Sequence, residues 1–183
     1  MYYLSVGRRI KTEQQGSALM FQILVRDKWK FLTTETLEDS IQFNLWEVAK
    51  LPWKLNRLLF WVRGMVKEPA SDEMFLQGIE ALKEQRLLVA VDLEHPEQSF
   101  EQLKSFSLIG QGEGNTARNG KAKIELGRKN LKVSELEFRI WELSYRYRTI
   151  EMIYSFIQNE GVDHDEFLDA LLNLFRDGLI YLE

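Results

Sequence analysis

The sequence contains no cysteine, only two histidines and only three prolines in 183 residues. The absence of cysteine excludes disulfides, thiolate nucleophiles and Cys-ligated zinc or iron–sulfur centres. No apolar run approaches the roughly 20 residues that a membrane-spanning helix needs, and residues 1–9 lack the apolar core of a secretory signal. These absences predict a protein without a membrane span, which we expect in the cytoplasm.

The composition is that of a globular protein. Hydrophobic residues make up 45 % and charged residues 28 % of the chain, which is close to the globular average and excludes a chain that is disordered throughout. Aromatic residues, at 12 %, are numerous enough to fill a sizeable core. The formal net charge of −4 gives no overall attraction for nucleic acid or anionic lipid.

An internal repeat organises the chain. Residues 41–48 align without a gap with residues 136–143 and share the pattern Phe-x-apolar-Trp-Glu. The same register places Trp61 opposite Phe156, and after a gap of three residues it resumes to the end of each copy. Because the shared motif is followed by the same order of apolar positions, we interpret the chain as a tandem duplication of a unit of about ninety residues.

Each copy predicts a short strand, a polar loop, a β-hairpin, three amphipathic helices and a closing strand. In the first copy the strand lies at 2–6, the loop at 11–17, the hairpin arms at 21–25 and 29–33, and the closing strand at 87–91. In the second copy the corresponding ranges are 106–109, 111–120, 122–126 with 131–133, and 179–182. The expected fold class is α+β, a tandem duplication of a winged-helix-like unit in which a small three-stranded antiparallel sheet precedes three helices. The expected domains are residues 1–91 and 106–183, joined by a linker at 92–105.

Capping motifs predict where the helices start. Ser134-x-x-Glu137 is a capping box, in which the serine oxygen and the glutamate carboxylate satisfy backbone amides. Thr36-x-x-Asp39 is its looser equivalent in the first copy. The other expected starts are Pro52 and Thr149 for the second helix of each copy, and Ser71 and Asp163 for the third.

Four segments of the second copy form an apolar pattern that ends in Gly-Leu-Ile. They are Ile140–Leu143, Arg148–Ile153, Val162–Leu168 and Leu172–Ile180. In this pattern the copy resembles the winged-helix peptide-recognition domains of ribosomal-peptide modification systems, the PqqD-like domains; the first copy matches in outline. The resemblance implies a protein that is not an enzyme and that holds a peptide as an added strand beside its third strand and third helix. The third strands contain Trp29 and Phe31 in the first copy and Leu131 and Val133 in the second.

The second helix of the first copy carries the most concentrated positive charge. Its cations are Lys50, Lys54, Arg57, Arg63 and Lys67, with no acidic residue between them. The first three are expected on one helical face, at i, i+4 and i+7. With Trp61 nearby, this face could bind an acidic peptide, a phosphate or a membrane surface. The alternative is a solvated face whose lysine stems cover apolar neighbours.

Many winged helices read duplex DNA with their third helix, which needs cations. Here residues 163–177 carry a net charge of −4 and residues 72–86 a net charge of −2, so both helices would repel phosphates. DNA binding therefore depends on other basic surfaces. These are formed by Lys50, Lys54, Arg57, Arg63, Arg146 and Arg148.

The sequence predicts no catalytic, metal or cofactor site. The Gly-x-Gly-x-Gly segment at 110–114 is not followed by a helix start or by Gly-Lys-Ser/Thr, as a phosphate cradle would be, and it favours a strand connector. His95 lies before a proline, and His164 lies among carboxylates that a helix cap explains.

We therefore predict a non-catalytic recognition or scaffold protein that binds a peptide or protein partner and could present a peptide to a partner enzyme. The candidate binding residues are Trp29, Phe31, Lys54, Arg57, Trp61, Leu131 and Val133. A DNA-binding transcription or replication factor is the alternative. A structural subunit that covers its exposed apolar surface by forming a homodimer is a third interpretation.

Overall fold

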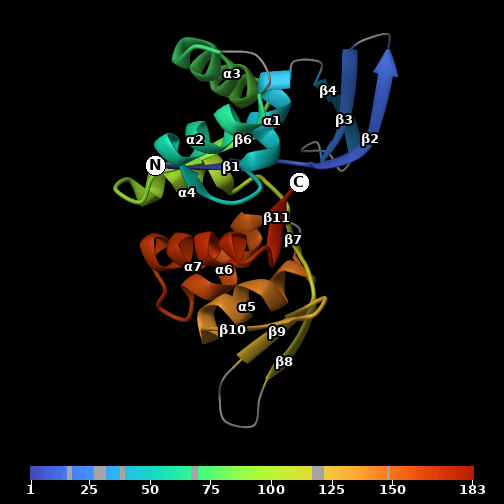
Figure 1. Ribbon diagram of the computed structural model, residues 1–183. Coiled ribbons are helices and arrows are strands. Elements are labelled where there is room, and N and C mark those ends of the chain that lie inside the picture. Colours follow the sequence, from blue (N-terminus) through green and yellow to red (C-terminus); the bar gives the residue numbers. More distant parts are fainter. Residues whose placement is uncertain (16–17, 27–31, 38–39, 67–69, 117–121, 148) are drawn as a thin grey trace. The chain divides into compact units, whose positions relative to one another are not determined.

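The computed structural model describes residues 1–183 except 16–17, 27–31, 38–39, 67–69, 117–121 and 148 (Figure 1). The chain divides into two compact units, residues 1–91 together with Glu183, and residues 92–182. Both units combine helices with small antiparallel sheets, so the chain is α+β, as its sequence predicts.

The two units contain the same succession of elements. The first comprises β1 (Tyr2–Ser5), β2 (Arg8–Gln15), β3 (Ala18–Arg26), β4 (Leu32–Leu37), α1 (Ser40–Val48), β5 (Trp53–Lys54), α2 (Leu55–Met65), α3 (Asp72–Glu84) and β6 (Leu88–Val91). The second comprises α4 (Pro96–Leu103), β7 (Leu108–Gly110), β8 (Glu113–Thr116), β9 (Ala122–Leu126), β10 (Lys129–Val133), α5 (Glu135–Ser144), α6 (Ile150–Gln158), α7 (His164–Arg176) and β11 (Ile180–Leu182). After α4, each element of the second unit has a counterpart in the first. Of the first unit's elements, β5 corresponds to a single bridge in the second.

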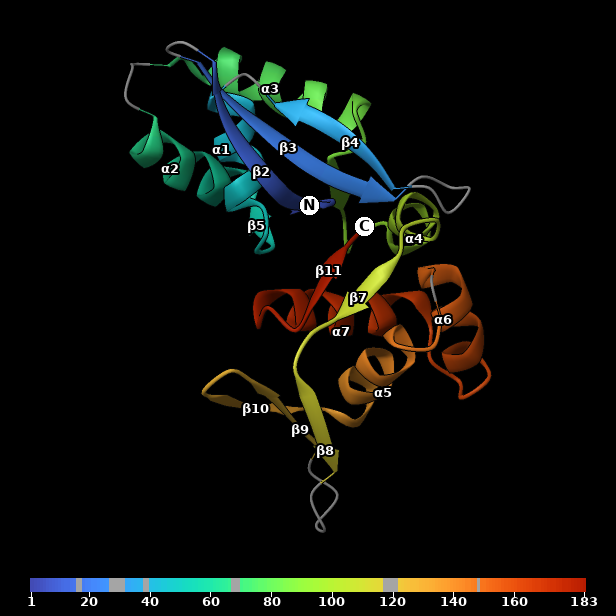
Figure 2. The same cartoon turned by 90° about the vertical axis from the view of Figure 1, so that its right-hand side faces the viewer.

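The strands of the two units also pair in the same way. β1 pairs with β6 and, through Tyr2 and Lys54, with β5. Correspondingly, β7 pairs with β11, and Ser107 forms an isolated bridge with Thr149 just before α6. A separate antiparallel sheet follows in each unit, in the orders β2-β3-β4 and β8-β9-β10 (Figure 2).

A tryptophan on the first helix of each trio holds the point where the chain passes from one sheet to the other. The indole Nε1 of Trp46 donates to the carbonyl of Val6 at 2.8 Å, and that of Trp141 donates to the carbonyl of Gln111 at 2.7 Å. The backbone amides of Val6 and Gln111 donate in turn to the carbonyls of Leu87 and Leu179. The crossing point is thus fixed from two sides in both units.

The next residue in each unit is a glycine in the left-handed region, Gly7 at φ 85° and Gly112 at φ 87°. A Cβ atom at these positions would lie 2.6 Å from the carbonyl oxygen of Leu24 and 2.3 Å from that of Glu125. Both the backbone angle and the lack of space therefore require glycine.

Strands β2 and β8 occupy much of the two segments that we expected to be polar loops, so that expectation is wrong. Arg9, Lys11 and Thr12 of β2 are exposed, yet its backbone pairs with β3 along its whole length, with one irregularity between Arg9 and Lys11. A ladder of backbone hydrogen bonds does not need apolar side chains, because an edge strand can face solvent. The hairpin formed by β9 with β10 is confirmed. The first unit also has a hairpin, formed by β3 with β4, but its second arm is Leu32–Leu37 and not 29–33; residues 29–31 lie outside the described residues.

Two of the expected helix starts are wrong and four are confirmed. Thr36 lies in β4, paired with Gln22, and therefore does not cap α1. Pro52 precedes β5, and α2 begins only at Leu55 because the two residues between them pair with β1. The confirmed N-caps, each accepting from a backbone amide, are Ser71, Ser134, Thr149 and Asp163.

The segment expected to be a linker belongs to the second unit. It contains α4, whose Phe100 and Leu103 are buried. The ring of Phe100 lies 4.7 Å from that of Tyr154 and 6.2 Å from that of Phe167. The apolar residues of residues 92–105 thus fill the core under α6 and α7.

We expect Trp46→Phe to lower the free energy of unfolding by about 2–4 kcal/mol, since the variant leaves the carbonyl of Val6 without its donor and removes buried volume. Trp46 has no exposed surface. Urea denaturation measures the change. Trp61→Phe is the matched control, because Trp61 is about half exposed (49 %) and we expect its replacement to change stability by less than about 0.5 kcal/mol.

The third helices of the two units end in the same hydrogen-bond pattern with different residues. The amide of Leu87 donates to the carbonyl of Leu82, and that of Leu179 to the carbonyl of Leu174. The residue before each amide is left-handed, Arg86 at φ 58° and Gly178 at φ 71°. Arginine is strained in this conformation, whereas glycine is not.

Arg86→Gly should therefore stabilise the protein by up to about 1 kcal/mol, less whatever the arginine side chain contributes. Gly178→Ala should destabilise it by a similar amount, because a Cβ there would have space, with Leu126 at 3.9 Å, but an unfavourable φ. The urea midpoints of the two variants, compared with that of the parent, show whether each substitution stabilises or destabilises the protein. A lower midpoint for Arg86→Gly would contradict the inference that Arg86 is strained.

Candidate functional site

The outer edge of β10 is open to an additional strand. β10 pairs with β9 from Lys129 to Val133, across a two-residue turn. In such a hairpin the residues next to the turn and every second residue after them exchange backbone hydrogen bonds across the pair. The amide and carbonyl groups of Asn130 and Lys132 therefore point away from β9. In the part of the chain that the structure describes, no strand pairs with this edge.

Positive charge surrounds this edge. The hairpin at residues 122–133 carries four cations, Lys123, Arg128, Lys129 and Lys132, and a single acid, Glu125. All four cations are exposed. Glu125 accepts a hydrogen bond from the side-chain amide of Asn130 at 3.0 Å. The surface that an incoming strand meets is therefore electropositive.

The strand edge is held in place from α7. Glu137 closes the capping box by accepting from the amide of Ser134, the residue after β10, at 2.7 Å. Its other carboxylate oxygen accepts from the side-chain amide of Asn173 on α7 at 3.0 Å. Arg176 donates to the side-chain oxygen of Asn173 at 2.7 Å. This chain of contacts fixes the end of β10 against the third helix.

The predicted binding residues on the hairpins differ in how far their side chains are exposed. Leu131 is half-buried on the inner face of β10, and Val133 is buried in the core. The side chain of Val133 is therefore unavailable to a partner, which could use only its backbone. Trp29 and Phe31 lie outside the described residues.

The expectation that Lys50, Lys54 and Arg57 share one helical face is wrong. Because α2 starts at Leu55, Lys50 lies in the turn after α1 and Lys54 lies in β5. Lys50 pairs with Glu47 at 2.8 Å, and its ammonium lies 4.8 Å from the ring centroid of Trp46. Only Arg57 is on the helix.

The basic residues expected to contact DNA are divided between the two units. Arg63 pairs with Asp72 at the start of α3. Arg146 is exposed in the turn after α5, in the other unit. Lys67 and Arg148 lie outside the described residues.

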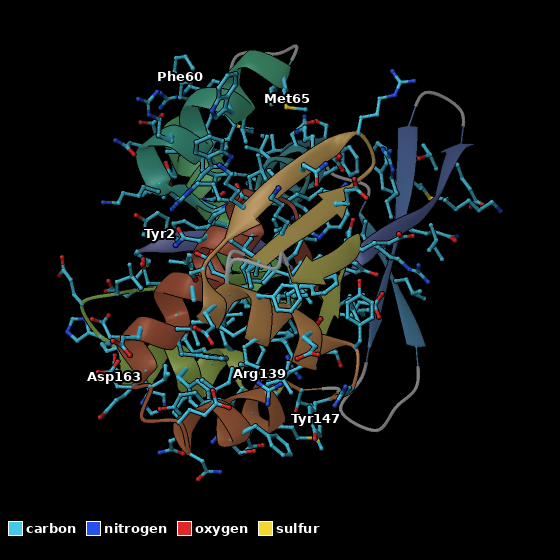
Figure 3. All side chains as sticks on the ribbon, turned by 90° about the horizontal axis from the view of Figure 1, so that it is seen from below. Tyr2, Phe60, Met65, Arg139, Tyr147 and Asp163 are labelled. Carbon is cyan, nitrogen blue, oxygen red and sulfur yellow. The ribbon has the colours of Figure 1, made fainter. Side chains whose placement is uncertain are left out.

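α2 nevertheless exposes a group of large apolar side chains that includes the predicted Trp61. Phe60 is 60 % exposed, Trp61 49 % and Met65 48 %. The ring of Trp61 lies 5.5 Å from that of Phe60 and 6.3 Å from that of Trp53. Figure 3 shows Phe60 and Met65 projecting from this helix. Sequence reasoning missed Phe60 and Met65 because it followed the charges of this segment.

The Gly-x-Gly-x-Gly segment is a packing feature. A Cβ at Gly114 would lie 2.2 Å from the ring of Trp141, and one at Gly110 would lie 2.5 Å from the hydroxyl of Ser144. The hydroxyl of Tyr145 donates to the carbonyl of Gly112 at 2.9 Å, and burial raises the pKa of this tyrosine. These glycines let the strands lie close to α5.

His164 also has a packing role in the first turn of α7. Its ring lies 4.5 Å from the rings of both Phe100 and Tyr154. Among the described residues there is no group of three or more His, Asp or Glu side chains that could hold a metal ion.

Lys132→Pro should cost less than about 1 kcal/mol of stability, since its amide points away from β9 and prolines are tolerated at such edge positions. Leu131→Pro should cost about 3 kcal/mol or more, because it removes a hydrogen bond to Ile124 inside the hairpin. Thermal unfolding of the two variants compares them. Equal losses would mean that Lys132 is also paired.

No helix in the described part of the chain is long and apolar enough to cross a membrane. The chain matches no protein-family model, and no curated protein or solved structure is significantly similar to it.

Proposed function

We propose that this protein is a non-catalytic peptide-binding protein, built from two winged-helix-like units that arose by tandem duplication. It holds an acidic, extended segment of a partner protein as a fourth strand beside β10. The observation that carries the proposal is the outer edge of β10, with which no described strand pairs and whose outward backbone groups at Asn130 and Lys132 lie among exposed cations.

The lysines of this edge select the partner by charge. Lysine on an edge strand opposes the pairing of two identical edges, because like charges would meet across the new ladder. An acidic strand would instead be attracted to this edge, since its carboxylates would face Lys129 and Lys132. The same side chains that suppress self-association therefore favour an acidic partner.

The charge of the rest of the second unit directs such a partner to the hairpin. Residues 92–182 contain 16 acidic and 11 basic residues, and four of these cations lie in the hairpin at residues 122–133. An acidic segment is repelled by most of this unit and attracted only where the cations gather. The acids of α7 also disfavour DNA as the ligand.

A display library of random twelve-residue peptides, selected against the whole protein, tests the proposal. We expect the enriched peptides to be acidic and rich in residues that favour strands, because affinity comes from backbone pairing and specificity from alternate side chains. Lys132→Pro, confirmed as folded by its thermal unfolding, should weaken their binding about ten-fold or more, since it deletes an outward donor.

N-methylation of alternate peptide residues serves as the matched control on the ligand side. Methylation of the amides that face β10 should abolish binding, whereas methylation of the intervening amides should leave it. Increasing salt should weaken binding, because the carboxylate–lysine attractions are exposed. Enrichment of basic peptides, or binding that Lys132→Pro leaves unchanged, would show that the ligand uses another surface.

A further inference from the structure

The outer face of α2 in the first unit carries more apolar surface than the fold requires. We define this face by Arg57, Phe60, Trp61, Gly64 and Met65, which are neighbours at spacings of three and four residues. All five are exposed. The buried side of the same helix consists of Leu58, Leu59 and Val62.

The equivalent helix of the second unit shows which apolar positions of α2 are needed for packing. Its counterpart α6 buries Ile153, Tyr154 and Ile157 at the positions of Leu58, Leu59 and Val62. At the positions of Phe60, Gly64 and Met65, however, the second unit has Ser155, Asn159 and Glu160, all exposed. At the positions of Arg57 and Trp61 it has Met152 and Phe156, which are exposed as well. The helix therefore packs on its unit without apolar side chains at the positions of Phe60 and Met65.

Gly64 distinguishes a protein partner from a lipid surface. It lies in the last turn of α2, in a helix where glycine is the least favourable residue after proline, and a Cβ at this position would have nothing within 4 Å. No contact within the described part of the unit explains the glycine. A bare backbone between Phe60, Trp61 and Met65 lets another helix approach closely, whereas a lipid surface would gain more from a larger apolar side chain.

The charge around this face specifies an acidic partner. α2 contains two arginines and no acid. Arg63 is paired with Asp72, but the side chains of Arg57 and of Lys54, at the start of the helix, have no acidic partner among the described residues. Residues 1–91 contain 13 cations and 11 acids, the opposite balance to the rest of the chain. If two copies of this face packed together, the Arg57 side chains of the two copies would repel each other.

We propose that the outer face of α2 docks an acidic amphipathic helix of a partner protein. Apolar residues of that helix pack between Phe60, Trp61 and Met65, its backbone crosses at Gly64, and flanking carboxylates face Arg57 and Lys54. This site is independent of the strand edge of β10, and it is a property of the first unit alone.

A displayed library of eighteen-residue helices tests the site directly. The library fixes leucine at i, i+3, i+4 and i+7 and randomises the flanking positions among Glu, Lys, Gln and Ser. We expect selection to enrich Glu at the flanks. The triple variant Phe60→Ser, Gly64→Asn and Met65→Glu, which copies the second unit, should weaken the selected helices about ten-fold or more, because it removes the apolar contacts and the close approach.

Three controls make the result decisive. The triple variant should unfold as cooperatively as the parent and keep binding to the strand-adding peptides, whereas Lys132→Pro should bind the selected helices unchanged. Single charge reversal by Arg57→Glu should reverse the preference from Glu to Lys at the flanks. This pattern would separate the α2 site from the β10 site even if one of the two proposals failed.

The proposal is wrong if no helix is enriched, if the enriched flanks are not acidic, or if the triple variant binds them equally well. Sedimentation that shows self-association lost in the triple variant would assign the face to a second copy of the chain. Binding to vesicles of phosphatidylserine and phosphatidylcholine that the triple variant abolishes would assign it to a membrane surface. Either result would overturn a helical protein partner.

Discussion

Each unit depends on one hydrogen bond from a buried or nearly buried indole to the backbone carbonyl at which the chain changes sheets. In the first unit Trp46 donates to Val6, and in the second Trp141 donates to Gln111. Without this donor the carbonyl would lie unpaired between the sheets and the helices, where an unsatisfied polar group is costly. The glycine that follows, at φ 85° or 87°, then turns the chain toward the hairpin sheet.

This constraint positions the proposed binding edge. Because a Cβ at Gly112 would lie 2.3 Å from the carbonyl of Glu125, the turn after Gln111 must run directly against β9. β8 then covers one side of β9 and β10 covers the other, so that β10 is an outer strand of this sheet, as is β8. The capping box and Asn173 tie the end of β10 to α7. The open edge is therefore a rigid part of the unit, as a strand-adding site requires.

Much of this architecture could be predicted from the sequence, because the signals were local or repeated. A capping residue marks the start of a helix because its side chain accepts a hydrogen bond from the amide three residues later. Ser134 and Asp163 both do this. The shared Trp-Glu motif marked the tryptophans that turned out to hold both units. The first and closing strands of each unit were readable because their apolar residues are continuous, but their pairing with each other was not predicted.

The errors arose where distant partners decide the local structure. β2 consists largely of polar residues, and only its ladder with β3 makes it a strand. Pro52 looked like a helix start, but β1 draws the next two residues into a sheet. The charged face was misjudged for a related reason: because α2 begins at Leu55, Lys50 and Lys54 lie outside the helix, and a face counted from Lys50 does not exist. Which residues are exposed depends on the core that the helix covers.

The differences between the two units carry the functional argument further than their similarities. Several positions that maintain the shared frame have equivalent residues, such as Gly7 and Gly112, whereas positions on the surface such as Phe60 and Ser155 have diverged in charge and size. Phe60 and Ser155 occupy the same place on equivalent helices, one apolar and one polar, and both are exposed. Since the frame tolerates either residue, folding does not account for the aromatic one. Surface differences on a shared frame thus separate what a unit needs in order to fold from what it presents to a partner, and they favour two units that bind through different surfaces.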